Sequence, residues 1–144
     1  SSLPFGSISG PQNMFNISRL LVFTLDASRE LPIIESVEQA LPAHDLIAAD
    51  AEQIQQGRGL YNVYCAVCHG GNAISGGLVP DLRYRVEELA AAWQSIVFDG
   101  ALAPNGMPAW KEFMTVKEVD QIKAYVTHEA TLGHQRGERR VIRK

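Results

Sequence analysis

Cys65-Ala66-Val67-Cys68-His69, near the middle of the chain, is the stretch that decides how the rest of the sequence is interpreted. Two thiols at this spacing lie about one helical turn apart, so both can reach the two vinyl groups of one haem. His69 follows at once and can place its imidazole under the iron, for which His is a usual ligand. C-x-x-C-H is the pattern of covalent c-type haem attachment. We therefore predict one haem c per chain, held by Cys65 and Cys68 and ligated by His69.

Two other uses of a C-x-x-C pair compete with haem attachment. A thioredoxin-like redox pair is expected in a βαβ context, which the sequence does not offer. A structural zinc site needs four ligands, so it would have to recruit a distant histidine such as His44, His128 or His134. Because the chain contains only these two cysteines, a disulfide framework is not a further competitor.

The composition predicts one soluble globular domain of ordinary size. The chain has 144 residues, of which 46% are hydrophobic and 20% charged, enough to bury a core around a large apolar ligand. Its net charge of −3 gives no reason to expect a nucleic-acid partner. No run approaches the roughly 18 apolar residues of a membrane helix, so we expect no membrane span. The sequence begins at Ser1 without an initiator Met or a signal peptide, so we expect a processed form or a piece of a longer protein.

The first 48 residues differ from the rest of the chain. Residues 19–26 are apolar and rich in β-forming side chains, which predicts one β-strand. A single strand is not stable alone, so it must pair with something in this domain or outside this chain. Residues 31–42, with Pro32 and Pro42, predict an extended linker.

Helical segments follow from residue 50 onward. Asp50 with Gln53 is a capping pattern that predicts a helix over residues 51–64, delivering Cys65. Apolar residues at helical spacing predict a second helix over residues 86–98. Two glycines inside the first helix, Gly57 and Gly59, each cost about 1 kcal/mol relative to Ala. Close approach of another helix would explain them.

A third helix is predicted from a second capping pattern. Thr115 with Glu118 predicts a helix that runs to about residue 130, with Gly133 marking its end. Residues 134–144 hold five basic residues and one acidic residue. This basic tail is either solvated and disordered or a docking arm for an acidic partner.

The ligand opposite His69 decides between an electron carrier and a catalyst, because Met ligation closes the iron and an open position invites small-molecule chemistry. Met107 lies in a loop between a glycine and a proline, a setting that can hold its thioether in one direction. Met114 next to a helix start has the character of a core residue, and Met14 lies in the N-terminal region. A His ligand or an open site remain further alternatives to Met107.

Other residues of the haem site are predicted from their positions. The backbone carbonyl of Pro80 is the candidate acceptor for the second ring nitrogen of His69, because such an acceptor orients a ligating His. Arg83, Tyr84 and Trp93 have polar tips and are candidates to bind the haem propionates. Each of the three also has an ordinary interpretation as a surface or core residue.

The motifs as a set resemble class I cytochromes c over residues 50–130. In chain order they are Gly57-x-x-x-Tyr61, Cys65-x-x-Cys68-His69, Pro80-x-Leu82, Gly106-Met107-Pro108 and Tyr125 in the late helix. The resemblance implies an all-α fold in which the first and last helices cross around covalent haem, here with an extended N-terminal segment. It also implies that His69 and Met107 hold the iron, and that Pro80 and Leu82 belong to the haem site.

A closer resemblance is to the C-terminal cytochrome domain of quinohaemoprotein alcohol dehydrogenases, carried by residues 60–70, 80–84 and 92–93. In that family an eight-bladed propeller with pyrroloquinoline quinone (PQQ) and calcium precedes the cytochrome. The resemblance implies that residues 1–48 are the last propeller strand and an interdomain linker. It further implies a cytochrome domain at 49–132 and a basic tail at 133–144. No residue of this chain corresponds to the ligands of PQQ or calcium.

What this resemblance implies for function is electron transfer. The domain would not be an enzyme by itself, and its parent would be a PQQ-dependent alcohol dehydrogenase of the bacterial periplasm. It would take electrons from reduced PQQ and pass them to a soluble or membrane-bound acceptor. A free-standing periplasmic cytochrome c shuttle is the alternative within the class, and a haem enzyme such as a peroxidase is the alternative from another class.

Overall fold

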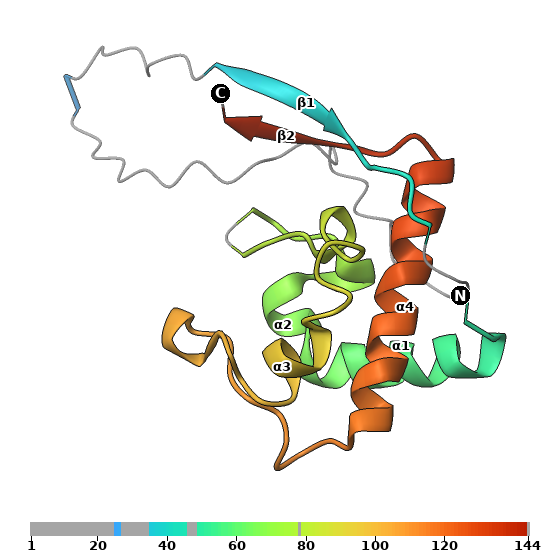
Figure 1. Ribbon diagram of the computed structural model, residues 1–144. Helices are drawn as coiled ribbons and strands as arrows, with labels where there is room; N and C mark the ends of the chain where they lie inside the picture. The colour runs from blue at the N-terminus through green and yellow to red at the C-terminus, as the bar shows by residue number, and fades with distance from the viewer. Residues whose placement is uncertain (1–24, 27–34, 46–48, 78, 144) are drawn as a thin grey trace, which may run out of the picture.

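The computed structural model describes residues 25–26, 35–45, 49–77 and 79–143. Their elements are β1 (Ser36–Ala40), α1 (Ala51–Tyr64), α2 (Ala66–His69), η1 (Gly71–Ala73), η2 (Leu82–Tyr84), α3 (Trp93–Val97), η3 (Ala103–Asn105), α4 (Val116–Gln135) and β2 (Arg139–Arg143). The long helix α4 crosses α1, and the two strands lie together at the C-terminal end of α4 (Figure 1). Among the helices described, none has both the length and the apolar character needed to cross a bilayer.

Helices α1 and α4 cross in direct contact at Gly57. A Cβ atom at this position would lie only 1.9 Å from the carbonyl oxygen of Gln121, so a side chain is excluded. One turn further along α1, the ring of Tyr61 packs on that of Tyr125, with 5.2 Å between ring centroids. The predicted close approach is therefore confirmed at Gly57. It is wrong at Gly59, where an added Cβ would meet nothing within 4 Å.

Both predicted helix caps are present. The side chain of Asp50 accepts a hydrogen bond of 2.8 Å from the backbone N–H of Gln53, and α1 runs over the predicted residues. Thr115 and Glu118 form both halves of a capping box at the start of α4. The helices enclose one core, formed by Tyr61, Ala73, Val86, Trp93, Val97, Met114, Val119, Ile122, Tyr125, Val126 and Ala130.

Two predicted helices differ from the observed ones. Only Trp93–Val97 of the segment 86–98 is α-helical. The residues before it wind as turns, because their N–H groups bond carbonyls at mixed separations: Leu89 to that of Arg85, four residues back, and Ala92 to that of Leu89, three back. Helix α4 runs past Gly133 to Gln135. Gly133 does not end the helix; it leaves room for the side chain of Leu41, which packs against it.

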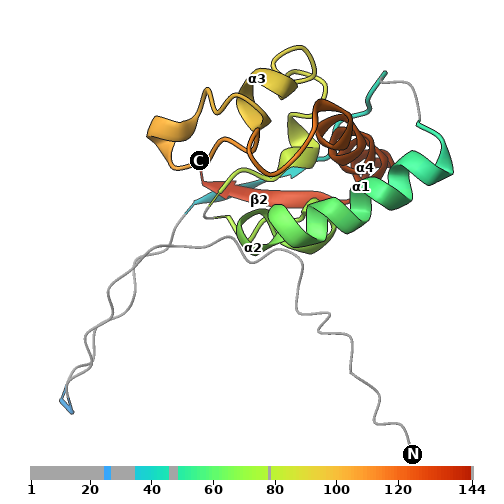
Figure 2. The ribbon, with the colours of Figure 1, turned by 90° about the horizontal axis from the view of Figure 1, so that it is seen from below.

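The segments predicted as a linker and a tail pair with each other. Strands β1 and β2 are antiparallel, with Ser36 opposite Arg143 and Ala40 opposite Arg139. The guanidinium of Arg139 also lies 3.3 Å from a carboxylate oxygen of Glu38. Figure 2 shows α4 close to end-on, with α1 running beside it. Strand β2 contacts η2 through Arg140, whose guanidinium lies 3.9 Å from the centroid of the Tyr84 ring. The disordered tail is therefore wrong for Arg139–Arg143, and the extended linker contains a regular strand.

The predicted strand at residues 19–26 lies outside the described residues, apart from Leu25 and Asp26. These two residues form a turn. The all-α prediction holds for the helical part, to which the pair β1–β2 is an addition.

Candidate haem site

The two cysteines and His69 lie on one helical turn. Helix α1 ends at Tyr64, and Cys65 leads directly into the short helix α2. The carbonyl oxygen of Cys65 accepts hydrogen bonds from the N–H groups of Cys68, at 3.1 Å, and His69, at 2.9 Å. Cys65 is half-buried and Cys68 is exposed, and neither is in a disulfide. One short turn thus presents two thiols and one imidazole together.

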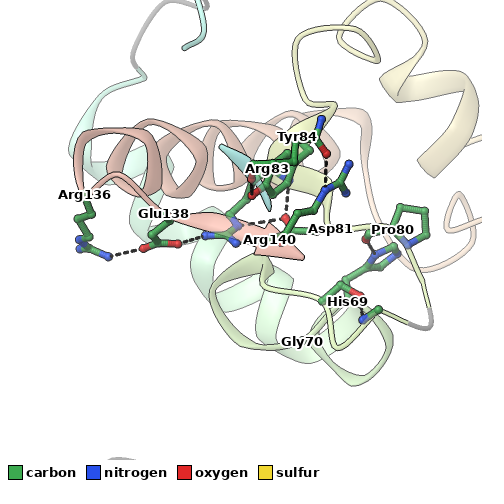
Figure 3. Close-up of polar contacts among 12 residues, drawn as sticks. His69, Gly70, Pro80, Asp81, Arg83, Tyr84, Arg136, Glu138 and Arg140 are labelled. Atoms are coloured by element: carbon green, nitrogen blue, oxygen red, sulfur yellow. Dashed lines mark hydrogen bonds and ion pairs between the residues drawn. The ribbon is translucent and has the colours of Figure 1, made fainter. Parts of the chain in front are cut away.

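The ring of His69 is oriented by the backbone of a distant loop. Its Nδ1 atom lies 3.1 Å from the carbonyl oxygen of Pro80, the contact predicted from the sequence (Figure 3). A carbonyl only accepts, so Nδ1 carries the proton in this contact and the lone pair of Nε2 is left for a metal. Gly70 then turns the chain sharply at φ 77°, and its carbonyl accepts a 2.9 Å hydrogen bond from the Tyr61 hydroxyl.

The thiol of Cys65 does not have the character of a redox cysteine. Burial, and next the proximity of Cys68, raise the pKa of Cys65 to about 12. Redox-active C-x-x-C pairs depend on a lowered thiol pKa. Cys65 therefore stays protonated in neutral solution, which disfavours the thioredoxin-like alternative.

Two of the three histidines named as alternative zinc ligands, His134 and His44, have other surroundings. The Nδ1 atom of His134 lies 2.8 Å from the carbonyl oxygen of Leu41. The imidazole of His44 is buried, with its Nδ1 3.9 Å from a carboxylate oxygen of Glu87. Within the described part of the chain, no group of three or more His, Cys, Asp or Glu side chains is placed to hold a metal ion.

Partly exposed apolar side chains lie on and next to the turn that carries the cysteines. Tyr64 packs edge-on against Trp110, with 5.3 Å between ring centroids, and Trp110 packs against Phe113 at 6.0 Å. Phe113 is 65% exposed and Val67 is 89% exposed. Partly buried apolar side chains that pack against the core include Leu60, Tyr64, Leu82, Ile96, Phe98, Met107 and Trp110. A covalent haem requires two thiols, an imidazole with a free nitrogen and apolar side chains to cover the ring. The residues of this site therefore fit a covalent haem.

The two described methionines occupy different settings. Met107 is half-buried on the loop after η3, where Gly106 adopts a left-handed φ of 93°. The backbone N–H of Met107 bonds the carbonyl of Leu102, which fixes the loop there. Met114 is 5% exposed and belongs to the core. Met14 lies outside the described residues. Ligation by Met107 stays a prediction.

Three of the other predicted site residues pack against the protein. Leu82 is half-buried against the core. The hydroxyl of Tyr84 donates a 3.0 Å hydrogen bond to the carbonyl of Gln39 on β1. The indole N–H of Trp93 donates to the carbonyl of Val119, at 3.1 Å, inside the core. Both polar tips thus have protein partners, and their contact with haem propionates stays a prediction.

Arg83 lies at the centre of a buried ionic group that sequence reasoning missed. Its guanidinium binds both carboxylate oxygens of Asp81, at 3.0 and 2.8 Å, and also binds Glu138 (Figure 3). Burial alone would lower the pKa of Arg83, but the hydrogen bonds and charges of the two carboxylates raise it above its ordinary value. The guanidinium therefore stays charged. Its binding of propionates stays a prediction.

Comparison with known proteins supports the haem interpretation. A family model described as "Cytochrome C oxidase, cbb3-type, subunit III" matches residues 52–126, about half of the chain. Quinohemoprotein alcohol dehydrogenase ADH IIB of Pseudomonas putida is 41% identical over 133 residues, which are 88% of this chain and 18% of that protein. The dehydrogenase subunit of an alcohol dehydrogenase (quinone) of Gluconobacter oxydans is 31% identical over 116 residues, 80% of this chain and 15% of that subunit.

A solved structure gives the same result for the fold. Quinohemoprotein alcohol dehydrogenase ADHIIG from Pseudomonas putida HK5 superposes with a TM-score of 0.60 and 34% identity. The superposition covers 79% of this chain and 16% of that one. The chain thus spans less than a fifth of the length of these relatives. The predicted class I cytochrome c fold is confirmed, and the chain belongs to the cytochrome c family, homologous to the cytochrome c region of quinohaemoprotein alcohol dehydrogenases.

Proposed function

We propose that this chain is the electron outlet of a PQQ-dependent alcohol dehydrogenase in the bacterial periplasm. It accepts electrons one at a time from reduced PQQ in a preceding domain and passes them to a soluble or membrane-bound acceptor. The observation that carries this proposal is the single turn of Cys65, Cys68 and His69, with His69 oriented by the carbonyl of Pro80. Homology to quinohaemoprotein alcohol dehydrogenases supports the choice of donor.

Each proposed residue has a distinct task. In the haem-loaded chain, Cys65 and Cys68 would anchor the haem through thioether bonds, and His69 and Met107 would ligate its iron. The bound haem supplies one-electron redox chemistry. Two protein ligands would keep the coordination of the iron the same in both oxidation states, so that little would rearrange when an electron arrives. The apolar side chains around the turn limit the access of water.

The extent of the homology supports a preceding catalytic domain. The likeness to ADH IIB covers 88% of the chain, whereas the family model begins at residue 52. The likeness must therefore continue into residues before α1. We assign residues 1–48 to the connection with a propeller domain and residues 49–132 to the cytochrome domain. PQQ and calcium would belong to the propeller domain.

Haem staining of a denaturing gel tests the proposal on the natural protein. Thioether-bound haem survives denaturation, so periplasmic extract of the source organism can be stained and probed with antibody against this chain. We expect a stained band several times larger than the 15.8 kDa of this chain. A stained band near 15.8 kDa would mean a free-standing cytochrome c shuttle and would contradict the fused enzyme. An immunoreactive band without stain would contradict covalent haem.

A further inference from the structure

The buried ionic group around Arg83 joins two distant parts of the chain. Asp81 is the N-cap of η2 and Arg83 lies within η2, whereas Glu138 lies between α4 and β2. Arg83 is 5% exposed and Asp81 is 7% exposed, so both charges are shielded from water. Buried charges of this kind persist only when they are paired and hydrogen-bonded. Each nitrogen of the Arg83 guanidinium meets a carboxylate oxygen, from Asp81 or from Glu138.

Arg83 immobilises the peptide that orients His69. The carbonyl in contact with His69 belongs to Pro80, and the next residue is Asp81. The carboxylate of Asp81 accepts three hydrogen bonds from Arg83, one from its backbone N–H at 3.1 Å and two from the guanidinium. Turning the Pro80 carbonyl away from the imidazole requires rotation next to Asp81, which would strain these charge-assisted bonds.

Glu138 holds the other side of the guanidinium, and the main chain fixes its own position. Its N–H bonds the carbonyl of Gly133 at 2.9 Å, and its carbonyl accepts from the N–H of Leu41 at 3.0 Å. A Cβ at Gly133 would lie 3.1 Å from Nη1 of Arg83 and 3.2 Å from Oε2 of Glu138. The ion pair therefore occupies a space that is available because residue 133 is glycine.

We propose that Arg83 and Glu138 are positioning residues for the haem ligand His69, acting through Asp81 and the carbonyl of Pro80. The inference rests on the proposed function, because it takes His69 as the iron ligand. An acceptor on the second ring nitrogen of a ligating His sets the orientation of the ring and its basicity toward the metal. Loosening the ionic group should therefore weaken the Nδ1–H bond of His69 and change the reduction potential.

The test measures the hydrogen bond itself in the ferrous, haem-loaded chain. Exchange of the Nδ1 proton of His69 with solvent is followed by ¹⁵N NMR in the parent and in Glu138→Gln, which keeps the shape of the side chain but removes its charge. We expect exchange to be about tenfold faster in the variant, because local opening of the Pro80 loop becomes easier. The reduction potential should shift in the same sample.

Glu88→Gln is the matched control. Glu88 forms an exposed ion pair with Arg85, so this variant removes the same charge without touching the buried group. We expect the parent exchange rate for His69 in the control. Arg83→Lys keeps the positive charge but loses the bidentate contact with Asp81. It should speed exchange of the His69 Nδ1 proton as Glu138→Gln does.

Three results would overturn the inference. Parent-like exchange and potential in Glu138→Gln would show that the ionic group does not act on His69. Equal acceleration of the His69 proton and of core amides such as that of Tyr125 would show general destabilisation instead. Both results leave the proposed function standing, because haem remains attached. A parent chain that takes up no haem would overturn the proposed function and this inference together.

Discussion

At the scale of single residues, the ability of His69 to bind a metal depends on which of its ring nitrogens is hydrogen-bonded to the protein. The carbonyl of Pro80 bonds Nδ1 and leaves the lone pair of Nε2 for the iron that we propose to bind there. This contact could be predicted from the sequence because the family motifs that carry it are short and local. The contact between Arg83 and Glu138 could not, because its partners are 55 residues apart and Glu138 belongs to none of the motifs.

The sixth ligand is tested by two methionine substitutions. Met107→Ala should abolish the weak far-red absorption band of sulfur-ligated ferric haem and lower the reduction potential, because Met ligation raises it. Met114→Ala should leave both unchanged and instead cost about 2–5 kcal/mol of unfolding free energy, as expected for a buried methionine. Absorption spectroscopy, spectroelectrochemistry and denaturant unfolding measure these effects. Loss of the band in Met114→Ala would show that the ligand assignment is wrong.

At the scale of elements, the molecule depends on the crossing of α1 and α4. The start of each helix could be predicted because a capping side chain and its target lie within one turn. The end of α4 could not, because Gly133 has the local signature of a stop. Its actual role is set by Leu41, whose Cδ2 would lie 2.6 Å from a Cβ at this glycine. The pairing of β1 with β2 could not be predicted either, because both segments are largely polar and they are distant from each other in sequence.

The helix crossing is tested by a matched pair of glycine substitutions. Gly57→Ala should lower the unfolding free energy by about 1–3 kcal/mol, because the new methyl group meets the backbone of Gln121. Gly59→Ala should raise it by about 0.5–1 kcal/mol, because this position is open and alanine favours the helix. Guanidinium unfolding of the haem-loaded variants measures both values. Equal effects of the two substitutions would contradict a close crossing of α1 and α4 at Gly57.

The capping box of α4 predicts a pH dependence. Hydrogen bonds from the backbone and side chain of Thr115 hold the pKa of Glu118 below its usual range. A lowered carboxylate pKa contributes stability at neutral pH, and this contribution is lost as pH falls through that pKa. Glu118→Gln should therefore have a lower thermal midpoint than the parent at neutral pH, and the difference should shrink as pH falls through the lowered pKa of Glu118. A difference that stays constant across this range would contradict the charged cap.

At the scale of the whole molecule, strand β1 and Leu41, which precede α1, belong to the folded part of the described chain. Leu41 is 2% exposed and rests on Gly133, while β1 pairs with β2 across the ends of the described chain. The described parts of the proposed linker and tail segments thus contact each other through the pair β1–β2. The described part of this N-terminal segment is attached to β2 through β1 and to α4 through Leu41.

This attachment is tested by Leu41→Ala. Removing the buried side chain should cost about 2–3 kcal/mol of unfolding free energy, because a cavity opens at the contact with α4. Val37→Ala is the control on β1, since Val37 is 40% exposed and its loss should cost less than about 1 kcal/mol. Guanidinium unfolding of the haem-loaded chains compares them. Equal small losses would mean that the segment does not stabilise the domain.

The central claim, that this is an electron carrier with both iron positions closed by His69 and Met107, is tested most directly by carbon monoxide. The purified ferrous, haem-loaded chain is mixed with carbon monoxide, and the Soret band is followed in a stopped-flow instrument. Closed coordination predicts no fast change, because the gas must wait for the thioether of Met107 to leave the iron. Binding as fast as to an open haem would contradict the account and indicate a haem enzyme with an exchangeable sixth site.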